Sequence, residues 1–195
     1  GHVGDDDIFY NCNKGEDFSF ITGLTKMGIE TIPPLVGRGV LINMAKHHGV
    51  SSMYGGQGIT REDIKKAIKK QNIELKKGDI ILFHTGWTDA KLKSSPEEWG
   101  ASIPGITNDA AVYLSEFKPM AVGADTWGLG AVPPIEGDKV YYDHVTLIKE
   151  NGIYILESMD TGMLARNNVT EFMFVLGQPK LKGAVQMIIN PVALW

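Results

Sequence analysis

The residues best suited to chemistry in this sequence are its histidines and two carboxylates that follow apolar runs. Asp125 and Glu157 each come at the end of a segment that is typical of a buried strand. A charge at such a place needs a partner or a metal ion, because its burial is otherwise costly. Imidazole and carboxylate groups are common zinc ligands, and histidine is the usual group for proton transfer. The sequence therefore indicates a His/Asp/Glu site, with histidine candidates at positions 2, 47, 48, 84 and 144.

Each candidate also has a structural explanation, and the sequence alone leaves both open. Glu157 would pair with a lysine or arginine at its strand end, and Asp125 would cap the turn that follows it. His84 lies inside an apolar run and is typical of a hydrogen-bonded core histidine. His47 and His48 are adjacent in a Gly- and Ser-rich segment that is expected to form a surface loop. On extended backbone their side chains would point in opposite directions, which makes them a poor pair for one metal.

Composition excludes several classes of protein. The 195 residues are 43% hydrophobic and 22% charged, which is typical of a globular chain and not of a disordered or collagenous one. The net charge is −4, so we expect no nucleic-acid partner. No run approaches the roughly 20 apolar residues of a membrane span, and we expect no membrane partner. The single cysteine, Cys12, permits no internal disulfide, which favours a cytoplasmic protein. Nucleophile-elbow, P-loop and dinucleotide-binding motifs are absent.

Helical and strand patterns alternate along the chain, which predicts an α/β fold with a mixed β-sheet flanked by helices. Apolar positions at helical spacing predict a helix over residues 17–28. Thr60 and Asp63 predict a capped helix start, and Thr107 is expected to cap a further helix. Residues 89–106 are expected to be a long loop. Apolar runs predict strands at residues 39–44, 80–84, 119–123, 153–157, 172–175 and 187–189.

Several segments occur in the same order as in one known family and together cover nearly the whole chain. They are Gly23–Glu30, Gly37–Leu41, Gly78–Trp87, Pro104–Ile106, Gly123–Gly128 and the stretch from His144 to Glu157. On these segments the chain resembles the cyclase family of metal-dependent hydrolases, which includes isatin hydrolase and the bacterial kynurenine formamidases. The likeness is closer to the isatin-hydrolase branch. The resemblance implies one compact domain over residues 1–195, with a fold of the swivelling β/β/α type.

The family's signature resembles His-x-Gly-Thr-His-x-Asp, followed a few residues later by another histidine. Only that last element is present here, as Gly1-His2, so we expect the domain to be N-terminally incomplete. By resemblance, His2 is the general base or proton shuttle, and His144 and Glu157 are metal ligands that complete the site or hold a second metal. The alternative for Gly1-His2 is a remnant of a purification tag.

The resemblance also implies a divalent metal, manganese or zinc, and a homodimer. Because half of the family's ligand set is missing, we expect the 195-residue chain to bind either metal weakly or not at all. A small aromatic substrate needs flat apolar walls, for which Trp127 and Trp87 are the substrate-binding candidates. Ordinary packing is the alternative for both indoles.

Together, these expectations predict a metal-dependent hydrolase that cleaves the C–N bond of a cyclic amide or an N-formyl aromatic compound. A bound divalent metal lowers the pKa of water to about 7, and a histidine then passes a proton to the leaving nitrogen. Two alternatives remain open. One is a hydrolase for another lactone or lactam, and the other is a non-catalytic structural or binding subunit.

Overall fold

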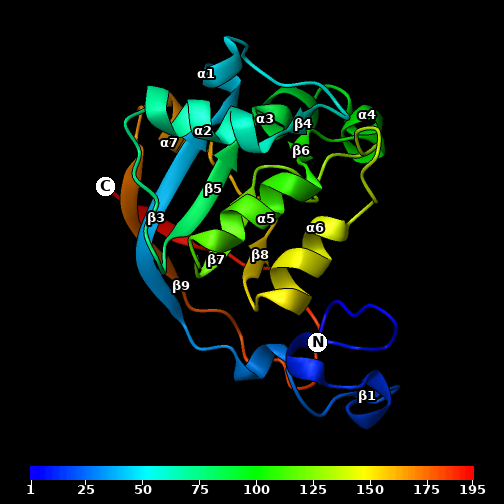
Figure 1. Ribbon diagram of the computed structural model, residues 1–195. Coiled ribbons are helices and arrows are strands. Elements are labelled where there is room, and N and C mark those ends of the chain that lie inside the picture. Colours follow the sequence, from blue (N-terminus) through cyan, green and yellow to red (C-terminus); the bar gives the residue numbers. More distant parts are fainter.

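A six-stranded mixed β-sheet runs through the protein in the order β10-β9-β3-β5-β7-β8 (Figure 1). The computed structural model describes residues 1–195. Strands β3, β5, β7 and β8 are parallel, β9 is antiparallel to β3, and β10 is antiparallel to β9. The α/β single domain with a mixed sheet that the sequence predicts is therefore confirmed.

The ten strands are β1 Ser19–Phe20, β2 Gly23–Leu24, β3 Leu35–Asn43, β4 Gly58–Ile59, β5 Ile80–His84, β6 Gly105–Ile106, β7 Ala121–Ala124, β8 Tyr154–Leu156, β9 Glu171–Leu176 and β10 Val192–Leu194. The α-helices are α1 Met44–His48, α2 Arg61–Lys70, α3 Trp87–Lys91, α4 Pro96–Ala101, α5 Asn108–Glu116, α6 Tyr142–His144 and α7 Gly162–Arg166. Three short 3-10 helices are η1 Tyr10–Cys12, η2 Gly15–Asp17 and η3 Ile29–Thr31, and a π-helix, η4 Val145–Glu150, continues α6.

Hydrophobic residues bury both faces of the central strands. Every residue of β5 and β7 is buried, which explains why their sequences are continuous apolar runs without alternation. One face packs with α2, α5 and η4 through residues such as Ile64, Leu114 and Leu147. The other face packs with α7, where Leu164 joins Phe172 and Phe174 of β9. The two cores hold the parallel strands in register.

Helix α2 begins as the sequence predicts. The Thr60 hydroxyl accepts a hydrogen bond from the Asp63 backbone N–H at 3.2 Å. The Asp63 carboxylate in turn accepts one from the Thr60 backbone N–H at 3.1 Å. This reciprocal capping box satisfies two donors that the first helical turn leaves free, and it fixes the position of the Asp63 side chain.

Three of the expected elements are wrong. Residues 17–28 are not a helix: the chain turns back through Ile21 and Thr22, Gly23 has a φ of +115° that does not occur in a helix, and β1 pairs with β2. Residues 89–106 are not one loop, because Pro96 begins α4, as proline often does at the first helical position. Residues 187–189 are not a strand, and the strand β10 forms after Pro191 instead.

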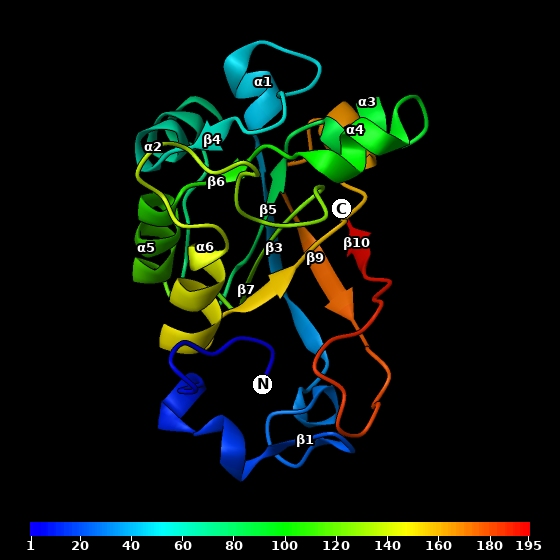
Figure 2. The same cartoon turned by 90° about the vertical axis from the view of Figure 1, so that its right-hand side faces the viewer.

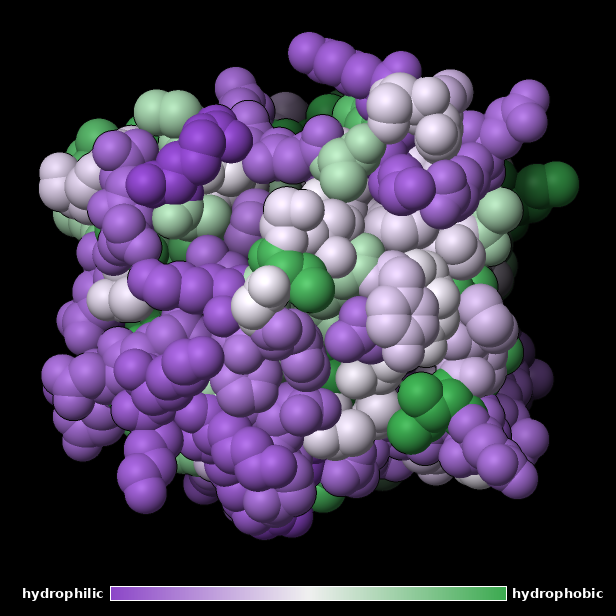
Figure 3. Space-filling view, turned by 90° about the horizontal axis from the view of Figure 1, so that it is seen from above, coloured by the Kyte–Doolittle hydropathy of each residue, from purple (hydrophilic) through white to green (hydrophobic).

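The adjacent histidines are also not in a loop. His47 and His48 are the last two residues of α1, and Gly49 ends that helix in the left-handed conformation, at a φ of +73°. Figure 3 shows the face of the molecule that carries α1, which is mostly hydrophilic.

The N-terminal segment and the segment that precedes β10 lie together at the end of the molecule opposite α1 (Figures 1 and 2). The Leu24 N–H donates to the Gly183 carbonyl at 2.9 Å, and the Ile29 N–H donates to the Ala184 carbonyl, also at 2.9 Å. These bonds hold the N-terminal segment against the segment that precedes β10. None of the helices is long and apolar enough to cross a lipid bilayer.

Asp125, which is 3% exposed, joins the ends of two neighbouring strands. Its carboxylate accepts hydrogen bonds from the Thr85 N–H at 2.9 Å, the Thr85 hydroxyl at 2.7 Å and the Gly86 N–H at 2.8 Å. His84 lies beside it and shares a 2.8 Å hydrogen bond with the Thr161 hydroxyl. His84 is therefore a hydrogen-bonded core residue, and Asp125 caps the residues after β5 and not the turn that follows its own strand.

Replacing Asp125 with alanine is expected to lower the free energy of unfolding by about 3 kcal/mol or more. The buried donors of Thr85 and Gly86 lose their acceptor, and each unsatisfied group costs about 1–3 kcal/mol. Chemical denaturation followed by circular dichroism measures this change. The matched control is Asp89→Ala, which removes an exposed ion pair with Arg166 and is expected to cost less than about 1 kcal/mol. Equal effects of the two substitutions would contradict this account.

Candidate functional site

A cavity of about 630 Å³ lies beside β8, the strand at one edge of the sheet. Most of its lining is apolar, and it comes from β8, the N-terminal segment and residues 185–189. Four polar or aromatic side chains that the sequence singles out also line it: His2, Trp127, His144 and Glu157. A large apolar pocket with a few convergent polar groups is the usual form of a small-molecule site.

The centre of this site is the imidazole of His144, which lies between two carboxylates. Its Nδ1 is 3.0 Å from Asp143 Oδ2, and its Nε2 is 3.1 Å from Glu157 Oε1. His144 and Asp143 are buried, whereas Glu157 is half-buried. The two carboxylates fix the orientation of the ring.

Burial and charge oppose each other at His144. Burial disfavours the charged imidazolium, but hydrogen bonds and Coulomb attraction from Asp143 and Glu157 outweigh it and raise the pKa of His144 to about 9. In the metal-free protein at neutral pH, His144 therefore carries a proton on each ring nitrogen and donates to both carboxylates.

Local backbone geometry explains how these groups meet. Glu157 follows β8, and the next N–H, that of Ser158, donates to the Thr126 carbonyl at 2.8 Å, which ties Glu157 to the end of β7. Gly130 passes so close to Asp143 that an added Cβ would lie 2.7 Å from the carboxylate oxygen Oδ1. A larger residue at position 130 would displace the carboxylate that holds His144.

His2 lies on the solvent-exposed side of the cavity. Its ring centroid is 6.3 Å from that of His144, and the protein provides no hydrogen bond to its ring. Partial desolvation and the neighbouring positive charge of His144 lower the pKa of His2. The ring is close enough to the His144–Glu157 pair to act on a molecule bound between them.

The two tryptophans occupy different places. Trp127 borders the cavity, and its indole N–H donates to the Trp99 carbonyl at 2.7 Å. Trp87 does not reach the cavity, because it is only 1% exposed and packs near α4, with a 3.4 Å contact from its indole N–H to the same carbonyl. Trp87 is thus a core residue of the α3–α4 region.

Sequence reasoning missed Asp143. It is 1% exposed, and its carboxylate is placed directly against His144. The only signal in the sequence is an Asp-His pair at the start of the helical turn, and adjacent residues on a helix do not ordinarily face each other. The cavity's wall from residues 185–189 was also missed, because residues 187–189 were expected to form a strand.

The residues of this cavity do not complete a metal site by themselves. His144 and Glu157 are in contact, but His2 does not bring a third ligand atom within 4.8 Å of both. Catalytic zinc sites use three protein ligands and leave one position for water. The donors present here therefore fall short of a resident catalytic metal.

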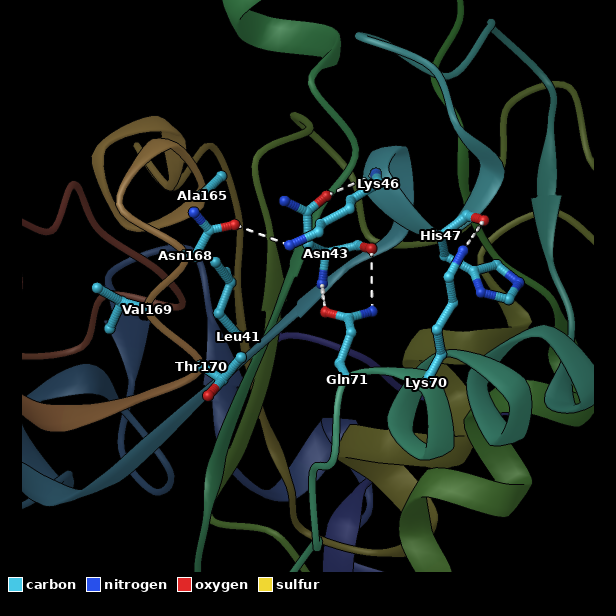
Figure 4. Close-up of a pocket in the computed structure, with 10 residues that line it drawn as sticks. All are labelled: Leu41, Asn43, Lys46, His47, Lys70, Gln71, Ala165, Asn168, Val169 and Thr170. Atoms are coloured by element: carbon cyan, nitrogen blue, oxygen red, sulfur yellow. Dashed lines mark hydrogen bonds between the residues drawn. The ribbon is translucent and has the colours of Figure 1, made fainter.

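A second pocket, of about 390 Å³, lies between the end of β3 and the residues that follow α7 (Figure 4). Its polar groups mainly satisfy one another. Gln71 exchanges two hydrogen bonds with the backbone of Asn43, at 3.0 and 3.1 Å, and Lys46 donates to Asn168 at 2.8 Å. This self-paired lining makes the pocket a weaker candidate than the cavity beside β8.

Comparison with known proteins identifies the family. The family model described as "Putative cyclase" matches residues 17–131, more than half of the chain. This chain belongs to the cyclase family. A crystal structure of a protein described as a novel cyclase is 27% identical, with a TM-score of 0.85, and the match covers 100% of this chain and 65% of that one. The chain thus spans about two thirds of the length of that relative.

Two more distant structures share the fold. One is described as a potential metal-dependent hydrolase with cyclase activity, at 21% identity and a TM-score of 0.60, covering 82% of this chain and 65% of that one. The other is an isatin hydrolase bound to the product analogue thioisatinate, at 19% identity and a TM-score of 0.65, covering 82% of this chain and 60% of that one. No curated protein matches the sequence.

Replacing Asp143 with asparagine is expected to lower the pKa of His144 from about 9 toward its ordinary value, because one of two stabilising charges is lost. NMR titration of the imidazole in metal-free protein measures this pKa. In the unfolded chain the pKa is about 6.5. The proton on His144 therefore stabilises the native fold fully below about pH 6.5, and this contribution is lost as the pH rises through about 9.

The matched control for this titration is Asp160→Asn, since Asp160 is exposed and makes no hydrogen bond to His144. It is expected to leave the pKa of His144 unchanged. An Asp143→Asn protein with the wild-type pKa at His144 would refute the role assigned to Asp143.

Proposed function

We propose that this chain carries part of the active site of a metal-dependent hydrolase that cleaves a C–N bond in a cyclic amide or an N-formyl aromatic compound. The observation that carries the proposal is the cavity beside β8, where His144 lies between Asp143 and Glu157 and His2 lies 6.3 Å away between ring centroids. Membership of the cyclase family supports the reaction class.

His2 is the proposed proton-transfer residue. The protein leaves its ring without a hydrogen-bond partner, and its exposed position lets the ring exchange protons with water. Cleavage of an amide needs a proton on the departing nitrogen, and a positioned histidine supplies it. His144 and Glu157 are the proposed polar anchors on the other side of the bound molecule.

Manganese or zinc is the proposed cofactor, and when bound it would supply a water of lowered pKa as the nucleophile. His144 and Glu157 are the only residues of the cavity whose ligand atoms are in contact, so no step is assigned to the metal from this chain alone. The relatives with this fold are longer than the chain, and we propose that the remaining ligands belong to the corresponding part of the full-length protein.

The proposed substrate is a small aromatic molecule. The cavity has mostly apolar walls, Trp127 borders it, and its volume of about 630 Å³ is within the usual range for small-molecule sites. A structural relative, an isatin hydrolase, is bound to the product analogue thioisatinate. Another lactone or lactam is the alternative substrate for the same site.

A non-catalytic role for the isolated chain is the second candidate. The incomplete ligand set in the cavity favours it, since fewer than three protein ligands converge there. Turnover separates the two functions. We expect the full-length protein with added Mn²⁺ or Zn²⁺ to hydrolyse isatin or N-formylkynurenine, and metal removal by a chelator to abolish this activity. Absence of turnover with both compounds and a panel of lactones and lactams would refute the enzyme proposal.

Replacing His2 with alanine in the full-length protein is expected to lower kcat by about 10²- to 10⁴-fold, the usual effect of losing a positioned acid or base. The metal content is expected to stay unchanged, because a proton shuttle is not a metal ligand. His144→Ala is expected to reduce metal occupancy as well as turnover. Rate assays paired with metal analysis distinguish the two roles.

The control for these variants is Lys93→Ala, which alters an exposed side chain outside the cavity and is expected to keep wild-type turnover. A His2→Ala protein with wild-type kcat would remove the catalytic assignment of His2.

We also propose that the protein is a homodimer, as its family resemblance implies. Neighbouring strands at one edge of the sheet carry an apolar row that faces solvent: Met173 lies opposite Leu194, and Val175 lies opposite Val192. Met173, Val192 and Leu194 are each about half exposed. A second copy of the chain is the proposed cover for this row, since self-association buries apolar surface that water otherwise contacts.

Light scattering is expected to give the mass of a dimer or a larger assembly for the wild-type chain and a lower mass for Met173→Glu, which places a charge in the apolar row. The matched control is Met163→Glu on α7, which is equally exposed but lies outside the row. A clean monomer of the wild-type chain at high concentration would refute the dimer.

A further inference from the structure

A second cluster of metal-ligating residues lies away from the cavity. His47 and His48 end α1, and Asp63 lies in the first turn of α2. One ligand atom from each of the three residues lies within 4.8 Å of the others. None of them lines the cavity beside β8.

The adjacent histidines lie together at the end of α1. On a strand they would point to opposite faces, but at the end of α1 their ring centroids are 5.0 Å apart, with the planes tilted by 75°. One ring nitrogen of each histidine lies within 4.8 Å of the other and of a carboxylate oxygen of Asp63, which is the spacing that a single bound ion needs.

The histidines also have an unexplained feature. The atoms His47 Nδ1 and His48 Nε2 are buried from solvent, and neither has a hydrogen-bond partner. An unsatisfied buried polar atom costs about 1–3 kcal/mol, so a native protein normally provides a partner for it. A metal ion beside the rings accounts for nitrogens that face no protein donor or acceptor.

Asp63 is held in position by the capping box. Both hydrogen bonds from Thr60, from its N–H at 3.1 Å and its hydroxyl at 2.7 Å, go to Asp63 Oδ2. They leave Oδ1 free to bind an ion. A carboxylate oriented by other hydrogen bonds is typical of metal sites, where such contacts fix the ligand geometry.

We propose that His47, His48 and Asp63 bind a divalent zinc-type ion, with water in the fourth position. Two imidazoles and one carboxylate favour zinc, copper or nickel over magnesium and calcium, which prefer oxygen ligands. The ammonium of Lys70 donates to the backbone carbonyl of His47 at 3.4 Å and not to a ring nitrogen (Figure 4). The bound ion cross-links α1 to the start of α2.

Zinc binding to the metal-free chain tests the proposal, with a competing chromogenic chelator as the probe and Co²⁺ absorption as a check of tetrahedral geometry. We expect one equivalent of Zn²⁺, no competition from Mg²⁺, and a higher melting temperature with zinc. His48→Ala is expected to weaken zinc binding by about 10-fold or more and to abolish the shift in melting temperature.

Two further variants keep the test decisive. Asp63→Asn retains the oxygen that Thr60 needs but loses the negative charge, so we expect weaker zinc binding and an unchanged melting temperature without metal. The double variant His144→Ala/Glu157→Gln is expected to bind zinc as the wild type does, which separates this site from the cavity. Wild-type affinity in His48→Ala, or loss of binding only in the double variant, would overturn the proposal.

Discussion

The close parallel alignment of β5, β7 and β8 is the constraint on which the rest of the structure depends. Strand β7 lies so near β8 that a Cβ added to Gly123 would be 2.4 Å from the Leu156 carbonyl oxygen, so position 123 must be glycine. Parallel strands end at the same edge of the sheet. As a result, the Asp125 carboxylate accepts hydrogen bonds from the residues that follow β5. Glu157 lines the same cavity as Trp127, which follows β7.

Each buried carboxylate in this fold has a defined set of partners. Asp125 accepts three hydrogen bonds from Thr85 and Gly86, and Asp79 pairs with Arg38 at 2.8 Å. Asp143 differs because its partner, His144, also faces the cavity. The first two carboxylates stabilise the ends of strands, whereas Asp143 orients a group that is available to a bound molecule. The buried carboxylates of Asp125 and Asp79 therefore stabilise the fold, and that of Asp143 positions a residue of the candidate site.

The histidine of the cavity and the histidine pair at the end of α1 differ in what their ring nitrogens contact. His144 has both ring nitrogens engaged by carboxylates, and these raise its pKa to about 9. His47 and His48 have buried nitrogens without a partner and share one nearby carboxylate, that of Asp63. The two carboxylates keep the imidazole of His144 protonated when no other ligand is bound. The arrangement of His47 and His48 leaves lone pairs free, which is the condition for binding an ion of the zinc type.

The sequence by itself determined the parts that depend on local pattern. The buried strands β5 and β7 and the capped start of α2 follow from runs and motifs within a few residues of one another, and the family follows from segments that occur in order along most of the chain. Tertiary structure decided the rest, because those features depend on how the folded chain packs and not on the spacing of residue types. It placed Asp143 against His144 and kept Trp87 out of the cavity. It formed a hairpin over residues 19–24, in which Phe20 is half exposed, where the sequence predicts a helix over residues 17–28.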